Sequence, residues 1–109
     1  MGITKTDNFS TNQNRIARLA KAIGHPARIA ILEYILKKNA CICGDLVDEL
    51  PLSQSTVSQH LKELKSVGLI QGEIEGNSVC YCIDEKVWKE TQVAINKMFD
   101  LFKPTKNCC

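Results

Sequence analysis

Hydrophobic residues recur at helical spacing through the first third of this chain. The first run has the i, i+3, i+4, i+7 pattern of an amphipathic helix and consists of Ile16, Leu19, Ala20 and Ile23. It predicts a helix over 12–23 that ends at Gly24. Pro26 suits the first turn of a second helix. The main apolar stripe of that helix is expected to be Ile29, Leu32 and Leu36, widened by Ile31 and Ile35. A helix this apolar should lie at the centre of the fold.

Two shorter helical patterns follow, and the second has a polar outer face. The first covers 44–50 and points Leu46, Val47 and Leu50 inward. Ser53 is a suitable N-cap for the second, and Gly68 ends it. At helical spacing its inward side chains are Val57, Leu61 and Leu64. Its opposite face carries Gln54, Ser55, Ser58, Gln59 and Lys62.

The last third of the chain predicts a hairpin and a final helix. Strands over 70–75 and 78–84 are joined at Gly76-Asn77, which suits a tight turn. In the second strand Val79, Tyr81 and Ile83 alternate with Cys80 and Cys82, so the two cysteines are expected on the open side of the hairpin. Asp84 can cap the final helix. That helix carries two apolar stripes: Trp88, Ile95, Phe99 and Phe102, and Val87, Ala94, Met98 and Leu101. Two stripes exceed the needs of one small core and favour a subunit interface.

The order of these elements indicates a helix-turn-helix, whose second helix enters the major groove of DNA. Short side chains with donors and acceptors suit base edges, which makes Gln54, Ser55, Ser58 and Gln59 the candidate base contacts. Phosphate contacts add affinity without choice of sequence. Candidates for the remaining DNA contacts are Ser53, Thr56, His60, Lys62, Lys65 and Asn77. Any solvated helix also has a polar face; the succession of two helices, a Gly stop and a hairpin favours DNA binding.

Length and charge limit the alternatives. The 109 residues predict one domain over 12–103, with tails over 1–11 and 104–109. The formal charge is only +2, so a basic DNA-facing surface must come from local placement. The polar N-terminal segment has no secretion signal, and no apolar stretch is long enough to cross a bilayer. The expected location is therefore the cytoplasm, with no membrane partner.

Several motifs resemble the ArsR/SmtB family of metal-sensing repressors. Residues 25–32, His-Pro-Ala-Arg-Ile-Ala-Ile-Leu, are similar to the family's Asp-Pro-x-Arg-x-x-Ile-Leu, and 52–64 match its recognition-helix pattern L-S-Q-S-x-[VI]-S-x-H-L-x-x-L. The Gly-Asp-Leu at 44–46 and the segment 68–81 resemble its next helix and its wing. The resemblance covers about 14–84. It implies a mainly α, dimeric winged helix-turn-helix that is not an enzyme. It also implies binding to palindromic double-stranded operator DNA, and release when an effector binds.

Six cysteines occur as three pairs: Cys41/Cys43, Cys80/Cys82 and Cys108/Cys109. In a reducing compartment they are metal ligands or redox thiols rather than a disulfide framework. Thiolates select soft ions, and cysteine sets without histidine fit trivalent arsenic or antimony better than zinc. No resident cofactor is expected. The candidate ligands are Cys41 and Cys43 with one or both of Cys108 and Cys109; a surface or interface role is preferred for Cys80 and Cys82.

The cysteine positions depart from the family pattern. Arsenic-sensing members often carry Cys-Val-Cys-Asp-Leu-Cys, whereas here the thiols at 41 and 43 fall one residue early and Val47 replaces the third cysteine. The family's zinc site on the last helix is missing too, because 87–102 hold no histidine. A thiol redox or reactive-sulfur sensor, or another soft-metal sensor, is therefore the alternative. A thiol-disulfide enzyme lacks its C-x-x-C motif, and a metal buffer would not need the polar helix.

Overall fold

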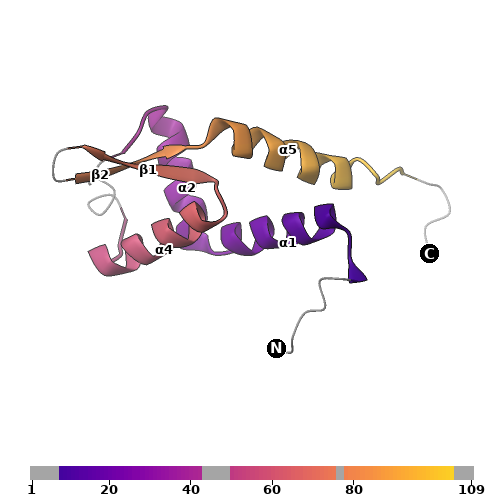
Figure 1. Ribbon diagram of the computed structural model, residues 1–109, viewed down its shortest axis with the longest axis horizontal. Coiled ribbons are helices and arrows are strands. Elements are labelled where there is room, and N and C mark those ends of the chain that lie inside the picture. Colours follow the sequence, from indigo (N-terminus) through magenta and orange to yellow (C-terminus); the bar gives the residue numbers. More distant parts are fainter. Residues whose placement is uncertain (1–7, 43–49, 76–77, 105–109) are drawn as a thin grey trace.

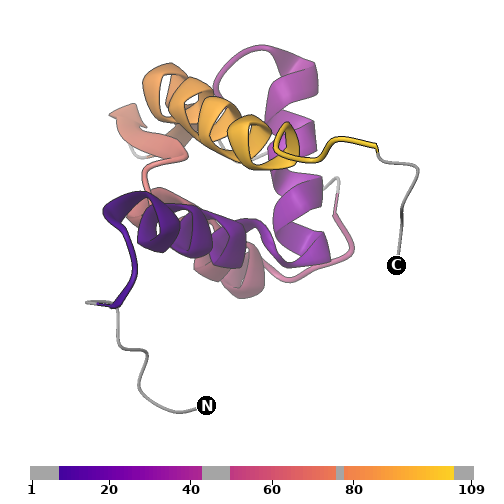
Figure 2. The same cartoon turned by 90° about the vertical axis from the view of Figure 1, so that its right-hand side faces the viewer.

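A computed structural model of the chain describes residues 8–42, 50–75 and 78–104. These residues form α1 (Thr11–Ile23), α2 (Pro26–Lys38), α4 (Gln54–Ser66), the strands β1 (Ile70–Glu75) and β2 (Ser78–Ile83), and α5 (Glu85–Phe99). In Figure 1 the hairpin lies at one end of the molecule, while α1 and α5 extend side by side toward the other. Figure 2 shows α2 standing across these two helices. The predicted class, mainly α with a small hairpin, is confirmed.

Polar caps fix where the helices begin. The Ser53 hydroxyl accepts from the Thr56 amide, and Asp84 accepts from Val87, as the sequence predicts. The imidazole of His25 caps α2 by accepting from the Ala27 amide. Helix α1 starts one residue earlier than expected because Ser10 and Gln13 form a capping box there. Gly24 ends this helix.

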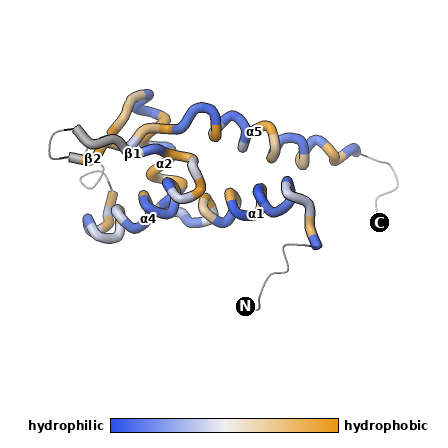
Figure 3. The backbone as a smooth tube through the Cα atoms, viewed as in Figure 1, coloured by the Kyte–Doolittle hydropathy of each residue, from blue (hydrophilic) through white to orange (hydrophobic). Residues whose placement is uncertain are grey.

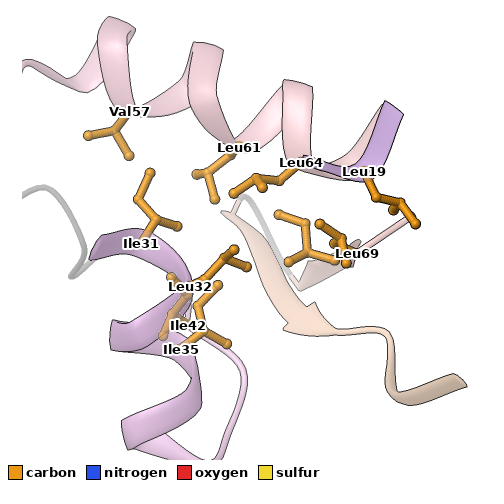
Figure 4. Close-up of a cluster of buried hydrophobic side chains, with 10 residues drawn as sticks. Leu19, Ile31, Leu32, Ile35, Ile42, Val57, Leu61, Leu64 and Leu69 are labelled. Atoms are coloured by element: carbon orange, nitrogen blue, oxygen red, sulfur yellow. The ribbon is translucent and has the colours of Figure 1, made fainter. Parts of the chain in front are cut away.

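The core forms where α2 faces α4. Figure 4 shows Val57, Leu61 and Leu64 directed from α4 toward α2. The residues of α2 that are buried are Ile31, Leu32 and Ile35. The predicted stripe was wrong in part, because Ile29 and Leu36 are 45% and 42% exposed. At about 100° per residue, a helix that turns Ile31, Leu32 and Ile35 inward carries these two away from the core.

Strand β2 lies between two neighbours. On one side it pairs antiparallel with β1, placing Gly72 opposite Tyr81. On the other side Ile42 forms an antiparallel bridge with the same Tyr81, through N···O distances of 2.9 and 2.8 Å. The chain leaving α2 therefore returns along β2. The expected open side of the hairpin is wrong for Cys80, which is 1% exposed, while Val79 on the other face is 45% exposed.

Helix α5 packs on α1 with only part of its apolar surface. Arg15 on α1 forms an ion pair with Glu90 on α5. The hydroxyl of Thr91, which is buried, donates to the Val87 carbonyl. Figure 3 shows hydrophobic positions recurring along α5 between hydrophilic ones. The helix ends at Phe99, so the last predicted stripe positions, Leu101 and Phe102, lie beyond it.

Some predictions fall outside the described residues. These are the helix over 44–50, apart from Leu50, the turn at Gly76-Asn77, and most of both predicted tails. Leu50 is partly buried against the core. Among the described helices, each is too short or too polar to cross a membrane.

Candidate nucleic-acid interface and thiol pair

Helix α4 presents a row of short polar side chains to solvent. Its apolar residues Val57, Leu61 and Leu64 are at most 6% exposed and fix the helix on the core. The predicted base-reading residues are all exposed: Gln54, Ser55, Ser58 and Gln59. The face is therefore accessible to a partner while its backbone is held by packing. This is the arrangement that a groove-reading helix requires.

The first turn of α4 is organised around Ser53. Its Oγ accepts from the Thr56 amide at 3.3 Å and lies 2.9 Å from the Thr56 hydroxyl and 3.2 Å from the Ser55 hydroxyl. The side chain of Ser53 thus serves first as the helix cap. Thr56 remains exposed, at the end of α4 where backbone amides face outward.

His60 does not lie on the outer face with the other predicted contacts. Its side chain is 9% exposed. Its Nδ1 accepts from Nε of Arg28 on α2 at 3.1 Å, and its ring centroid lies 4.6 Å from that of His25. The prediction of an exposed His60 was wrong. The signal was present, because His60 completes the i, i+3, i+4, i+7 pattern of Val57, Leu61 and Leu64.

This placement determines the electrostatics of His60. Burial lowers its pKa, because the imidazolium loses hydration, and the electrostatic influence of the neighbouring His25 and Arg28 lowers it further. The carboxylate of Glu63 opposes these effects. In addition, only a neutral imidazole can accept the Arg28 hydrogen bond. His60 and Arg28 thereby join the polar helix to the start of α2, a role that sequence reasoning did not assign.

Cationic side chains flank the polar row. Lys62 and Lys65 are exposed on α4. The Nζ of Lys65 lies beside Gly72 of β1, 3.4 Å from the position of a Cβ there, so this lysine reaches toward the hairpin. A hollow of about 530 Å³ lies between α1, α2 and α4, where Arg18, Lys21 and Arg28 contribute positive charge. The predicted contact Asn77 lies outside the described residues.

Two of the six cysteines meet at the end of α2. Asn39 ends this helix in the left-handed conformation, with φ of 51°, and turns the chain toward β2. The Ile42–Tyr81 pair exchanges both backbone hydrogen bonds, so the adjacent pair, Cys41 and Cys82, stands at the closer, non-hydrogen-bonded spacing. Their Cα atoms are 4.4 Å apart and their sulfurs form a disulfide. The sequence analysis predicted free thiols rather than disulfides, and for Cys41 and Cys82 this prediction was wrong.

The other cysteines divide into two groups. Cys80 is buried and is also disulfide-bonded. Cys43, Cys108 and Cys109, which were predicted as ligands with Cys41, lie outside the described residues. Within 8–42, 50–75 and 78–104, no three His, Cys, Asp or Glu side chains are grouped as a metal site would require.

A pocket of about 370 Å³ adjoins the Cys41–Cys82 pair. Its apolar wall is formed by Ile35, Leu36, Ala40 and Ile83. Asn39 and Glu85 contribute polar groups. This volume lies within the range of small-molecule sites, roughly 300–1,000 Å³. Sequence reasoning did not predict the pocket, because its walls come from α2, β2 and α5.

Comparison with known proteins agrees with this geometry. Residues 25–71 match the family model described as bacterial regulatory protein, arsR family. The chain is 43% identical over 63 residues to the HTH-type transcriptional repressor SmtB of Mycobacterium tuberculosis, covering 58% of this chain and 46% of that protein. It is 35% identical over 75 residues to an uncharacterized HTH-type transcriptional regulator, MJ1325, of Methanocaldococcus jannaschii, covering 67% and 83%. The chain thus spans less than half the length of SmtB.

Solved structures show the same architecture. HlyU from Vibrio cholerae superimposes with a TM-score of 0.67 at 29% identity, covering 86% of this chain and 98% of that one. In the part of the chain that the structure describes, four helices, one of which (α4) presents an outward polar face, and an antiparallel hairpin define a winged helix-turn-helix DNA-binding fold. The chain belongs to the ArsR/SmtB family of transcriptional regulators.

Proposed function

We propose that this protein is a homodimeric repressor that binds a palindromic operator through α4 and leaves it when trivalent arsenic or antimony binds its cysteines. The observation that carries the DNA-binding half is the exposed row Gln54, Ser55, Ser58 and Gln59 on a helix anchored by buried leucines. The row would read base edges in the major groove, which is about 12 Å wide and admits a helix.

Phosphate contacts would come from residues around this row. Thr56 lies at the start of α4, and Lys62 and Lys65 lie along its exposed side. Lys65 reaches toward β1, which brings positive charge to the side of α4 that faces the hairpin. These contacts would add affinity for any sequence and make binding fall steeply with salt.

A dimer interface is supported by exposed apolar side chains at the C-terminal end of α5 and just beyond it. Phe99 is 66% exposed, and Leu101 and Phe102 are 79% and 77% exposed. The single chain leaves these large apolar side chains exposed, and burying them against a second copy would favour association. Two-fold symmetry would then place two copies of α4 on successive half-sites, about one helical turn of DNA apart.

The effector half of the proposal rests on sulfur chemistry. Soft thiolates bind soft ions, and the chain supplies six cysteines. The set proposed from the sequence is Cys41 and Cys43 with Cys108 and Cys109. The position of Cys41 beside Cys82 supports adding Cys82 to this set. Binding would favour a conformation whose α4 helices no longer fit both half-sites.

A thiol redox sensor is the second candidate, and the Cys41–Cys82 disulfide favours it. Two thiols would give two electrons and two protons to hydrogen peroxide, forming the S–S bond and two molecules of water. Oxidation would tie the chain after α2 to β2 of the hairpin. Such a sensor would recover its DNA affinity when a thiol reductant restores the two cysteines.

Fluorescence anisotropy on the DNA upstream of the gene separates these candidates. The reduced protein is titrated with arsenite, antimonite, cadmium, zinc or hydrogen peroxide. Release by arsenite or antimonite without oxidation of thiols to disulfides supports the proposal. Release only by peroxide, reversed by reductant, supports the redox candidate. If a cysteine-free variant still leaves the operator with arsenite, sulfur capture is not the mechanism.

A further inference from the structure

We propose that the reduced Cys41–Cys82 pair and its adjoining pocket bind a monosubstituted organic arsenical, a trivalent arsenic that carries one carbon substituent. This inference rests on the proposed function and specifies its effector class. Two sulfurs line the same pocket as Leu36, Ala40 and Ile83. The sulfurs would bind arsenic, and the apolar wall would receive the organic group.

The number of bonds fits this class of ligand. Trivalent arsenic forms three bonds, and Cys41 and Cys82 supply two sulfurs that already stand within bonding distance of each other. An organic arsenical fills the third position with carbon. Inorganic arsenite held by the same two sulfurs would keep a hydroxyl group at the third position, so only the organic form places carbon against the apolar wall formed by Leu36, Ala40 and Ile83. The pair therefore suits the organic form.

The chemistry balances in two steps. A phosphine or a cellular thiol first reduces the disulfide: a phosphine takes the oxygen atom of one water molecule and leaves two thiols. The two thiols then displace two hydroxyl groups from the hydrated arsenical. Two As–S bonds form, two As–O bonds break, and two water molecules leave, while arsenic stays trivalent. The product is neutral, which suits burial beside Ile35 and Ile83.

The local backbone holds the two sulfurs at fixed positions. Ile42 is 4% exposed and its backbone is paired with Tyr81 in both directions, so the segment stays on β2 without the S–S bond. Asn39 closes α2 just before the pocket wall at Ala40. A preorganised dithiol loses little conformational freedom when it binds, which favours affinity.

The test uses the full-length chain with only Cys41 and Cys82 retained, the other four cysteines being replaced by Ser. After reduction by a phosphine and its removal, phenylarsine oxide is added and the intact mass and free thiols are measured. One phenylarsenic per chain with loss of both thiols is expected. The adduct should be lost in Cys41→Ser, an exposed position whose substitution is compatible with folding. A stable adduct without Cys41 would overturn the assignment.

A pocket variant separates this site from an ordinary dithiol. Ala40→Phe should fill the pocket and weaken phenylarsine oxide about 10- to 100-fold in competition with a small dithiol, the range expected for one buried apolar group. Its affinity for arsenite should stay unchanged. Val93→Phe, an exposed site on α5, is the matched control. Equal weakening of both arsenicals, or of neither, would overturn the pocket's role.

Anisotropy on operator DNA distinguishes the two proposals. Release of DNA by phenylarsine oxide at lower concentration than by arsenite, dependent on Cys41, supports both. A pocket-dependent adduct that leaves DNA bound supports the site and contradicts the proposed release. Release by arsenite from a Cys41→Ser/Cys82→Ser variant, with no selectivity for the organic form, keeps the proposed arsenic-dependent release, assigns it to the remaining cysteines and overturns this site.

Discussion

Single residues connect the polar helix to the rest of the molecule. His60 accepts from Arg28, and the same guanidinium donates to the Ala22 carbonyl at 3.0 Å, so one arginine links α4 with the end of α1. The imidazole of His25 caps α2 and lies against His60. Two histidines and one arginine thus fix the junction of three helices. The protonation state of His60 should affect this junction directly.

We predict that His60 makes the fold sensitive to acid. Its folded-state pKa lies below the ordinary value of 6.5, chiefly because of burial, so the unfolded chain takes up this proton more readily. The stability that neutral His60 contributes is complete above about pH 6.5 and falls as the pH drops through its folded pKa. Urea unfolding at about pH 7.5 and 5.5 measures the loss.

His60→Asn is the matched variant, since its side-chain oxygen can accept from Arg28 but does not titrate. The free energy of unfolding should depend less on pH in this variant, with His25 unchanged in both proteins. An equal pH dependence would show that the buried imidazole is not the responsible group.

At the level of elements, sequence patterns predicted helix boundaries well and inward faces less well. Ser53, Asp84 and Gly24 mark ends that depend on local backbone chemistry, and these predictions hold. The pairing of Ile42 with Tyr81 and the burial of Cys80 were both missed, because each depends on tertiary contacts rather than on the alternation within β2. Likewise, only tertiary contact decides which of several apolar stripes on α2 is buried. Long-range pairing leaves no periodic trace in a single sequence.

We predict that the outer face of α4 determines which DNA sequence is bound and contributes little to the stability of the fold. Replacing Gln54, Ser55, Ser58 and Gln59 with Ala should cost about 1–3 kcal/mol of specific binding for each side chain that contacts a base. The free energy of unfolding should change little, because all four are exposed. Anisotropy against operator and scrambled DNA measures the preference. Full preference in the quadruple variant would place the reading face elsewhere.

A core variant controls for the opposite effect. Leu64→Ala, at a side chain that is 0% exposed, should lower the free energy of unfolding by about 2–5 kcal/mol. Where the variant is still folded, its preference for operator over scrambled DNA should remain.

The link between Cys41 and Cys82 should stabilise the chain when oxidised. The two residues are 41 positions apart, and closing a loop of this size in the unfolded chain is worth about 2–4 kcal/mol. The variant that retains only these two cysteines should therefore unfold at lower urea concentration after reduction. Identical midpoints for the two redox forms would contradict this stabilisation.

The whole molecule is elongated, and its far end is apolar. The Cα extents are 57 × 33 × 27 Å, with α1 and α5 forming the long arm in Figure 1. The hairpin and the exposed polar face of α4 lie toward the other end. This separation allows one end to associate while the other binds DNA. The sequence indicated this division through the surplus apolar positions of α5.

Association through the arm predicts a clear mutational effect. Phe99→Asp combined with Leu101→Asp should convert a dimer to a monomer, since each places a charge on an apolar contact surface. Sedimentation velocity measures the change, and operator affinity should fall with it. Val79→Asp, also at an exposed apolar residue but on the hairpin, is the control. A dimer that survives the double substitution would place the interface elsewhere.

Strand β2 is shared by three parts of the protein. One edge belongs to the hairpin, the other carries the bridge to Ile42, and two residues after Cys82 the chain reaches Asp84, the cap of α5. A chemical change at the Cys82 sulfur therefore acts directly on β2, which belongs to the hairpin and leads into the cap of α5. We expect substitutions in β2 to alter sensing, DNA affinity and assembly together, and these traits to resist being evolved or engineered one at a time.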